Sequence, residues 1–129
     1  MDIKALVPKD KYDITVISEL KKLSDTEIEP IIPGLLEWIQ DMDWPVAGDT
    51  AEILSVHSKV TAPFIPKLLR PEQTDDIWKF NIITYLLKRN RSFSENALIT
   101  AEVERIAVSP TKGEQLEDVD KAAKSYLRE

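Results

Sequence analysis

Cysteine is absent from the 129-residue sequence, and histidine occurs once, as His57. The absence of cysteine excludes disulfides, zinc–thiolate sites and thiol nucleophiles, and it leaves the redox compartment open. A single histidine also excludes a metal site built on two histidines. Because His57 falls on the apolar face of an expected helix, we expect a hydrogen-bonded core residue there. No cofactor is predicted from this composition.

Long apolar runs are also absent. The uncharged window from Pro30 to Leu36 contains two prolines and a glycine, and it is far shorter than the roughly 20 residues that span a membrane. The segment Met1–Lys9 has no long apolar stretch of the kind that a signal peptide requires. We therefore expect a soluble, cytoplasmic protein without a membrane span, folded as one domain over residues 1–129.

Lysine and arginine are missing from Leu23 to Ser58, a stretch that carries eight acidic residues and that we call the acidic unit. The stretch from Lys59 to Arg91, the basic unit, has seven basic and three acidic residues and a net charge of +4. The whole chain carries −6. Lysine and arginine supply most of the affinity for a nucleic-acid backbone, so this balance predicts no nucleic-acid partner.

One seven-residue pattern occurs twice. Residues 30–36 read PIIPGLL and residues 63–69 read PFIPKLL, so both fit P-x-I-P-x-L-L at an offset of 33. An acidic turn and a tryptophan, Trp44 or Trp78, follow each copy. A period of 33 to 34 residues that holds two helical patterns is typical of α-solenoid repeats. We therefore interpret the chain as a row of stacked helix pairs.

Helical periodicity divides the chain into an N-terminal helix and three helix pairs, over about 30–58, 63–90 and 94–128. The helix from Ile77 to Asn90 is apolar around most of its circumference, which is typical of a helix buried between neighbours. We expect it to be the central helix. The expected connections include Lys59–Ala62 and the turn Thr111–Gly113.

Helix start signals support these boundaries. Ser24 and Glu27 match a capping box, in which each side chain satisfies a free backbone N–H. Asp43 precedes the second helix of the first pair, and Asp75 or Asp76 precedes that of the second pair. Aspartate oxygens accept hydrogen bonds from the free N–H groups of a first turn, so these residues are the expected caps.

The order of short helix, acidic turn, aromatic residue and long helix resembles HEAT-like repeats, in which an aspartate often precedes the second helix of each pair. The resemblance covers roughly residues 29–127, although neither copy has the arginine that HEAT repeats commonly place at the start of the second helix. It implies an all-α fold, a short right-handed α-α superhelix of about three helix pairs plus an N-terminal helix.

Three segments also resemble a small bacterial family of unknown function. They are LVPKDKYD at residues 6–13, LLEWIQDMDWPVA at residues 35–47 and DIWK at residues 76–79. This resemblance implies a helical fold and transfers no catalytic residue to the chain.

The acidic unit is the candidate binding surface. Its expected partner-binding residues are Glu37, Asp41, Asp43, Asp49 and Glu52. Stacked helix pairs present extended surfaces, and a block of one charge steers a partner of the opposite charge. The sequence therefore favours a non-enzymatic protein-protein interaction module for a basic protein, in its specific form an immunity-type inhibitor of a basic toxin. The opposite charges of the two units would also allow a homodimer.

A second interpretation is a metal-dependent hydrolase in which Asp41 and Asp43 coordinate a cation or act as acid and base. Capping explains Asp43 more simply, so no catalytic or metal-binding residue is assigned. Trp44 and Trp78 could anchor a partner, but their equivalent places in the repeat favour packing between helices. The cluster Lys88–Arg91 lies at a helix C-terminus, where it is expected to offset the helix dipole.

Overall fold

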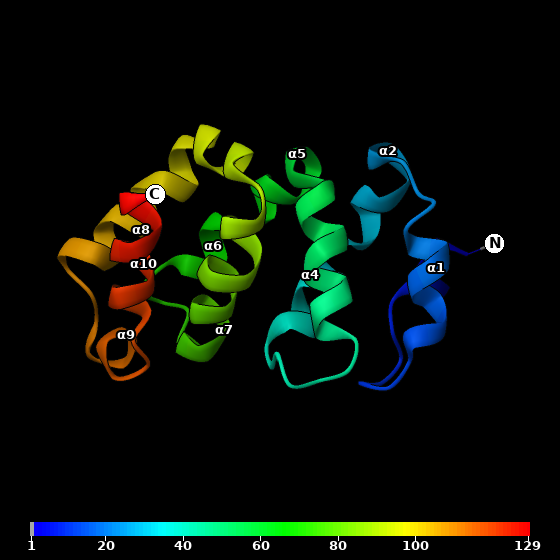
Figure 1. The fold of residues 1–129 in the computed structure, drawn as a ribbon, viewed down its shortest axis with the longest axis horizontal. Helices are drawn as coiled ribbons and strands as arrows, with labels where there is room; N and C mark the ends of the chain where they lie inside the picture. Colours follow the sequence, from blue (N-terminus) through cyan, green and yellow to red (C-terminus); the bar gives the residue numbers. More distant parts are fainter. Residues whose placement is uncertain (1) are drawn as a thin grey trace.

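The computed structural model describes residues 2–129, and helices are the only regular elements in this range. Figure 1 shows them following one another along the long axis in chain order, from α1 and α2 near the N-terminus to α8, α9 and α10 near the C-terminus. The α-helices are α1 (Ile17–Leu20), α2 (Asp25–Ile28), α3 (Ile32–Leu36), α4 (Ala47–Val56), α5 (Ser58–Thr61), α6 (Pro66–Leu69), α7 (Asp76–Asn81), α8 (Ala97–Val108), α9 (Lys112–Leu116) and α10 (Val119–Arg128). The prediction of an all-α fold is confirmed.

The two copies of the repeated pattern form the same local structure. In the first copy a 3₁₀ turn, η3 (Glu29–Ile31), leads into α3, which has a proline in its first turn. In the second copy η5 (Ala62–Phe64) leads into α6, which begins at a proline. A first turn leaves its N–H groups without intrahelical partners, so the missing N–H of proline costs nothing there. The equivalent residues Ile32 and Ile65 are both completely buried.

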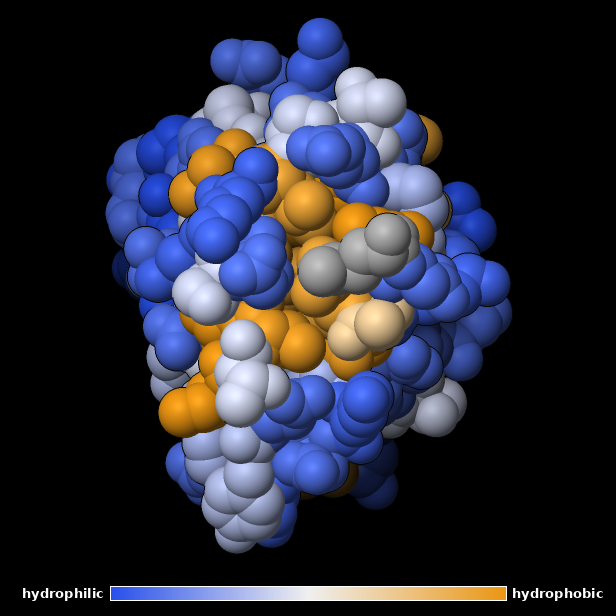
Figure 2. All heavy atoms as spheres, turned by 90° about the vertical axis from the view of Figure 1, so that its right-hand side faces the viewer, coloured by the Kyte–Doolittle hydropathy of each residue, from blue (hydrophilic) through white to orange (hydrophobic). Residues whose placement is uncertain are grey.

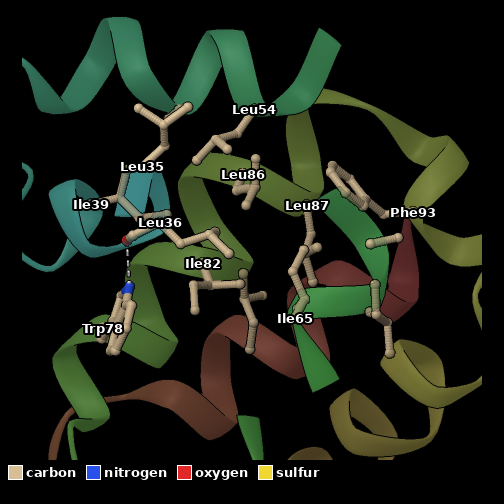
Figure 3. Packing of buried hydrophobic residues seen from close by; sticks show 14 of the residues in the cluster. Leu35, Leu36, Ile39, Leu54, Ile65, Trp78, Ile82, Leu86, Leu87 and Phe93 are labelled. Atoms are coloured by element: carbon tan, nitrogen blue, oxygen red, sulfur yellow. Dashed lines mark hydrogen bonds between the residues drawn. The ribbon is translucent and has the colours of Figure 1, made fainter. Parts of the chain in front are cut away.

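The last leucines of the two copies, Leu36 and Leu69, are bound at their backbone carbonyls by side chains from later in the chain. Nε1 of Trp78 donates to the Leu36 carbonyl at 3.0 Å, and Figure 3 shows the indole reaching that carbonyl from α7. Nη2 of Arg105 donates to the Leu69 carbonyl at 2.8 Å. A helix end leaves its last carbonyls unpaired, so each short helix is completed by a later element.

The expected central helix is present but changes its winding. After α7 the chain forms a π-helical turn, η6 (Ile82–Leu86), and then a 3₁₀ turn, η7 (Leu87–Arg89). The element η6 contacts both α4 and α10, and its apolar side chains lie in the core region drawn in Figure 3. Ile77 and Tyr85 are 51% and 38% exposed, so one side of this helix faces solvent and the helix is not buried all round.

The prediction that Asp43 caps α4 is wrong. The helix begins at Ala47 with Val46 at the N-cap position, and no side chain caps it. The chain turns before the helix starts, because the Trp44 amide donates to the Asp41 carbonyl at 3.2 Å. The Trp44 ring packs edge-on against Trp38, with 5.3 Å between ring centroids. This aromatic contact lies in the turn that separates Asp43 from the helix.

Two expected connections are also helical. Lys59–Ala62 lies largely within α5, which follows α4 after a break at His57. The predicted turn Thr111–Gly113 is instead the start of α9, with Thr111 as its N-cap. The Thr111 side chain accepts a hydrogen bond from the Glu114 amide at 3.1 Å, while the Glu114 carboxylate accepts one from the Thr111 amide at 2.8 Å. This reciprocal pair is a capping box that starts a helix where we expected only a turn.

Two other caps are as predicted. Ser24 and Glu27 form the expected capping box at the start of α2. The Asp75 side chain accepts a hydrogen bond from the Trp78 amide at 3.0 Å and caps α7. Buried apolar residues form one cluster that extends along the chain from Leu6 to Tyr126. No helix within residues 2–129 combines the length and the apolar character needed to cross a membrane.

Candidate functional site

The five predicted partner-binding carboxylates lie in one part of the chain, between α3 and the middle of α4. Glu37 starts the 3₁₀ turn η4 (Glu37–Ile39), Asp41 and Asp43 lie in the following loop, and Asp49 and Glu52 lie on α4. All five residues are exposed. Within residues 2–129 none of them forms an ion pair. We call these five residues the acidic face, after their shared charge and exposure; Glu37 lines one hollow of the surface and Glu52 lines another.

The loop of the acidic face is held by its own side chain. Oδ1 of Asp41 accepts a hydrogen bond from the Asp43 amide at 2.9 Å, which is an Asx turn. Asp49 lies in the first turn of α4, where the partial positive charge of the helix N-terminus favours a carboxylate. The backbone at Asp41, Asp43 and Asp49 is therefore held by local structure, while the side chains remain exposed to solvent.

A groove of about 230 Å³ adjoins the acidic face, between the two copies of the repeated pattern. Its lining residues are Pro33, Gly34, Leu36, Glu37, Phe64, Lys67, Leu68 and Trp78. The lining is mainly apolar, and its charged side chains are Glu37, which directly follows the first copy, and Lys67 from the second copy. The Trp78 indole is 8% exposed, and its hydrogen bond to Leu36 fixes it in the wall of the groove.

A second hollow, of about 240 Å³, contains the sole histidine. It is lined by Lys21, Glu52, Ile53, Val56 and His57. His57 is 7% exposed, and its Nδ1 lies 2.6 Å from Oδ1 of Asp25. The prediction of a hydrogen-bonded core histidine is confirmed. The contact joins α2 to the end of α4, the helix that carries Asp49 and Glu52.

Much of the basic unit is used inside the protein. Lys79 is completely buried against Glu114, Nζ of Lys88 lies 3.0 Å from Oε2 of Glu129, and Arg91 lies over the Tyr126 ring at 4.1 Å. Lys88 and Arg89 lie in the last turn of η7, where compensation of the helix dipole was predicted, and Lys88 and Arg91 also bind residues at the C-terminal end of the chain. Within residues 2–129 the five carboxylates of the acidic face thus have no ion-pair partner, while several cations of the basic unit have partners inside the protein.

Glu114 is a buried charge that the sequence analysis missed. Its two oxygens accept hydrogen bonds from Lys79 at 2.7 Å and from Arg105 at 2.7 and 2.9 Å. Burial raises the pKa of Glu114, but the hydrogen bonds from Arg105, Lys79 and the Thr111 amide outweigh this effect and hold the pKa at about 2. The spacing Thr111-x-x-Glu114 was the available sequence signal, since it matches a capping box.

Groups of three or more His, Asp or Glu side chains that could hold a metal ion are not found in the described range, 2–129. Asp41 and Asp43, the pair considered for metal binding, instead share the Asx turn through a backbone amide. Trp44 and Trp78 differ in their surroundings. Trp78 is buried and hydrogen-bonded, as packing between helices requires, whereas Trp44 is half-buried against Trp38.

Comparison with known proteins identifies one family. A family model described as "Domain of unknown function (DUF5071)" matches residues 6–127, which is nearly the whole chain. No curated protein matches the sequence.

Proposed function

Since the chain belongs to the DUF5071 family, whose description assigns no activity, we propose from the site itself that the protein is a non-enzymatic interaction module that binds a basic protein on its acidic face. The observation that supports this proposal is the set of five exposed carboxylates without an ion-pair partner in residues 2–129. Unpaired carboxylates raise the local negative potential, which speeds association with a positively charged partner.

The architecture included in this proposal is a short right-handed superhelix of HEAT-like helix pairs. The equivalent starts of α3 and α6, and the similar binding of the Leu36 and Leu69 carbonyls, support a repeated unit. Stacked units of this kind form extended surfaces on which partners bind. The groove next to Glu37 would then lie where two units meet, adjacent to the acidic face.

The specific form of the proposal is an immunity-type inhibitor of a basic toxin. An inhibitor needs a rigid surface that the partner meets without rearrangement, because ordering a loop on binding reduces affinity. The Asx turn at Asp41 holds the loop of the acidic face, and the contact between His57 and Asp25 holds the end of α4. A toxin that acts on nucleic acid carries a basic active site, whose charge the acidic face complements.

Capture by matched charge variants tests the proposal. The wild-type chain, an acidic-face variant (Asp41→Lys, Asp43→Lys, Glu52→Lys) and a control (Glu95→Lys, Glu104→Lys, Glu117→Lys) are immobilised and exposed to lysate of the source organism. Both variants change the net charge equally, and all six positions are exposed. We expect the wild type and the control, but not the acidic-face variant, to retain a basic protein that mass spectrometry identifies.

Salt and activity provide two further readouts of the same experiment. Binding should weaken between about 50 and about 300 mM NaCl, because salt screens exposed charges. A captured nuclease should lose activity when the wild-type chain is added and keep it when the acidic-face variant is added. Equal retention by the wild type and both variants would overturn the proposal, since net charge or an unrelated surface would then explain capture.

A further inference from the structure

One end of the molecule has an apolar surface. Figure 2 shows it at the end where α1 and the N-terminal segment lie, as an apolar area surrounded by hydrophilic side chains. The first elements, including η1 (Ile3–Leu6) and η2 (Ile14–Val16), carry apolar residues that keep part of their surface exposed. These residues are Ile3, Val7, Ile14, Val16 and Leu23. We call them the N-terminal apolar face.

This face is unusual for the end of a row of helices. An inner layer buries apolar side chains on both sides, whereas a terminal layer needs a polar outer side to remain soluble. Ile14 is 56% exposed, and Ile3, Val7, Val16 and Leu23 pack on the core while remaining partly accessible. Exposed apolar patches with a polar rim mark interaction sites.

The charges of the segment that carries most of this face indicate which partner it fits. Residues 2–22 contain five lysines and four acidic residues, whereas the acidic unit that follows contains no lysine or arginine. The lysines are Lys4, Lys9, Lys11, Lys21 and Lys22, and the acidic residues are Asp2, Asp10, Asp13 and Glu19. In a two-fold contact the same surface meets itself, so charges of one sign would repel and charges of both signs can pair. A strongly basic partner, a strongly acidic one or an anionic membrane would instead favour a border of one sign.

We propose that the N-terminal apolar face is the interface of a two-fold homodimer, in which each copy covers the apolar face of the other. The inference does not depend on the proposed function, because no residue of the acidic face belongs to it. It also differs from a homodimer driven by attraction between the acidic and basic units. Apolar contact provides the association here, and the mixed charges around it allow two chains of net charge −6 to approach.

Sedimentation velocity over a range of protein concentrations tests the dimer. We expect the wild type to sediment as a dimer at high concentration, and Ile14→Lys and Ile3→Lys each to sediment as a monomer. Lysine at these positions would put like charges at the contact. Val108→Lys is the matched control, because Val108 is 85% exposed on α8, near the other end of the row. Circular dichroism of each variant shows whether it remains folded.

Salt separates the two kinds of homodimer. Raising NaCl from about 50 to about 500 mM should leave the apolar dimer intact, whereas a dimer held by the acidic and basic units should dissociate. A wild-type chain that stays monomeric at all concentrations would overturn the proposal. A dimer that dissociates in salt, or that Ile14→Lys and Ile3→Lys leave intact while folded, would overturn it as well.

Discussion

Nζ of Lys79 lies 2.7 Å from Oε2 of Glu114, and both side chains are completely removed from solvent. The contact joins α7 to α9 over a sequence separation of 35 residues. Arg105 also binds the Glu114 carboxylate, at 2.7 Å from Nη1 to Oε1. Buried charges are tolerated when they are paired and hydrogen-bonded, and this carboxylate has partners on both oxygens. The network therefore anchors the C-terminal helices on α7.

Replacing Glu114 should be more harmful than replacing Lys79. Glu114→Gln leaves Lys79 buried with only Asp76, 3.5 Å away, as a carboxylate partner. Removing one member of a buried ion pair costs about 3–5 kcal/mol, because the remaining charge loses its compensation. Lys79→Met should cost less, since Glu114 keeps both hydrogen bonds from Arg105. Urea unfolding of both variants measures the two losses.

The double variant Lys79→Met, Glu114→Gln completes a mutant cycle. It should be less destabilised than the sum of the two single variants, because it leaves no buried lysine without a partner. Lys121→Met is a suitable control, as its ion pair with Asp118 is exposed and should contribute less than about 1 kcal/mol. Strictly additive losses at Lys79 and Glu114 would contradict the coupling described here.

The stability of the protein should decrease as the pH is lowered, because Glu114 becomes protonated. Its pKa is about 2 in the folded protein and 4.5 in its ordinary state, so folding favours the charged form. The corresponding stability, about 3 kcal/mol, is fully present above pH 4.5 and is lost as the pH falls toward 2. Between pH 5 and pH 3 the wild type should therefore lose more stability than Glu114→Gln. Urea midpoints at several pH values compare the two, and parallel curves would contradict the assignment.

Local sequence signals predicted much of the fold, as the start of α2 and the start of α7 illustrate. The Ser24–Glu27 capping box and the Asp75 cap depend on residues three apart, so the sequence alone contains the interaction. The cap proposed at Asp43 failed because the chain forms a turn over Asp41–Trp44 and α4 begins only at Ala47. An aspartate can start a turn as well as a helix, so the local pattern did not decide between them.

The candidate site, too, could be predicted from the sequence only in part. A missing charge, such as the absence of lysine and arginine from Leu23 to Ser58, is visible in the sequence, so the exposed acidic face could be anticipated. The burial and pairing of the lysine and arginine side chains could not be anticipated. Lys79 occupies a helical position that looks solvent-exposed in sequence, but its partner, Glu114, lies 35 residues away. The apolar face at the N-terminal end depends equally on which elements do not cover it, and periodicity carries no such information.

Trp78 should be among the most sensitive positions of the core. It is 8% exposed and donates from Nε1 to the Leu36 carbonyl at 3.0 Å. Trp78→Ala should cost about 3–5 kcal/mol through the cavity it creates. Trp78→Phe keeps an aromatic ring but leaves the carbonyl unpaired, which adds about 1–3 kcal/mol to the packing change. Thermal and urea unfolding check both values, and a loss below about 1 kcal/mol for Trp78→Ala would show that the indole is not part of the core.

Two glycines should respond to alanine in opposite directions. A methyl group at Gly48, in the first turn of α4, would meet no atom within 4 Å. A methyl group at Gly113 would overlap the carboxylate of Asp76, which is mostly buried beside Lys79. Alanine in a helix is favoured over glycine by roughly 0.5–1 kcal/mol, so Gly48→Ala should stabilise the protein by up to that amount.

Gly113→Ala should instead destabilise the protein by about 1–3 kcal/mol, because the added methyl group must displace Asp76 from its contact with Lys79. Asp76→Ala removes the obstructing carboxylate, so Gly113→Ala should cost less in that background than in the wild type. Urea unfolding of the four chains measures this coupling. Equal costs in the two backgrounds would mean that α9 moves away from α7 to accommodate the methyl group, and the close approach of Gly113 to Asp76 would then play no part in holding the C-terminal helices.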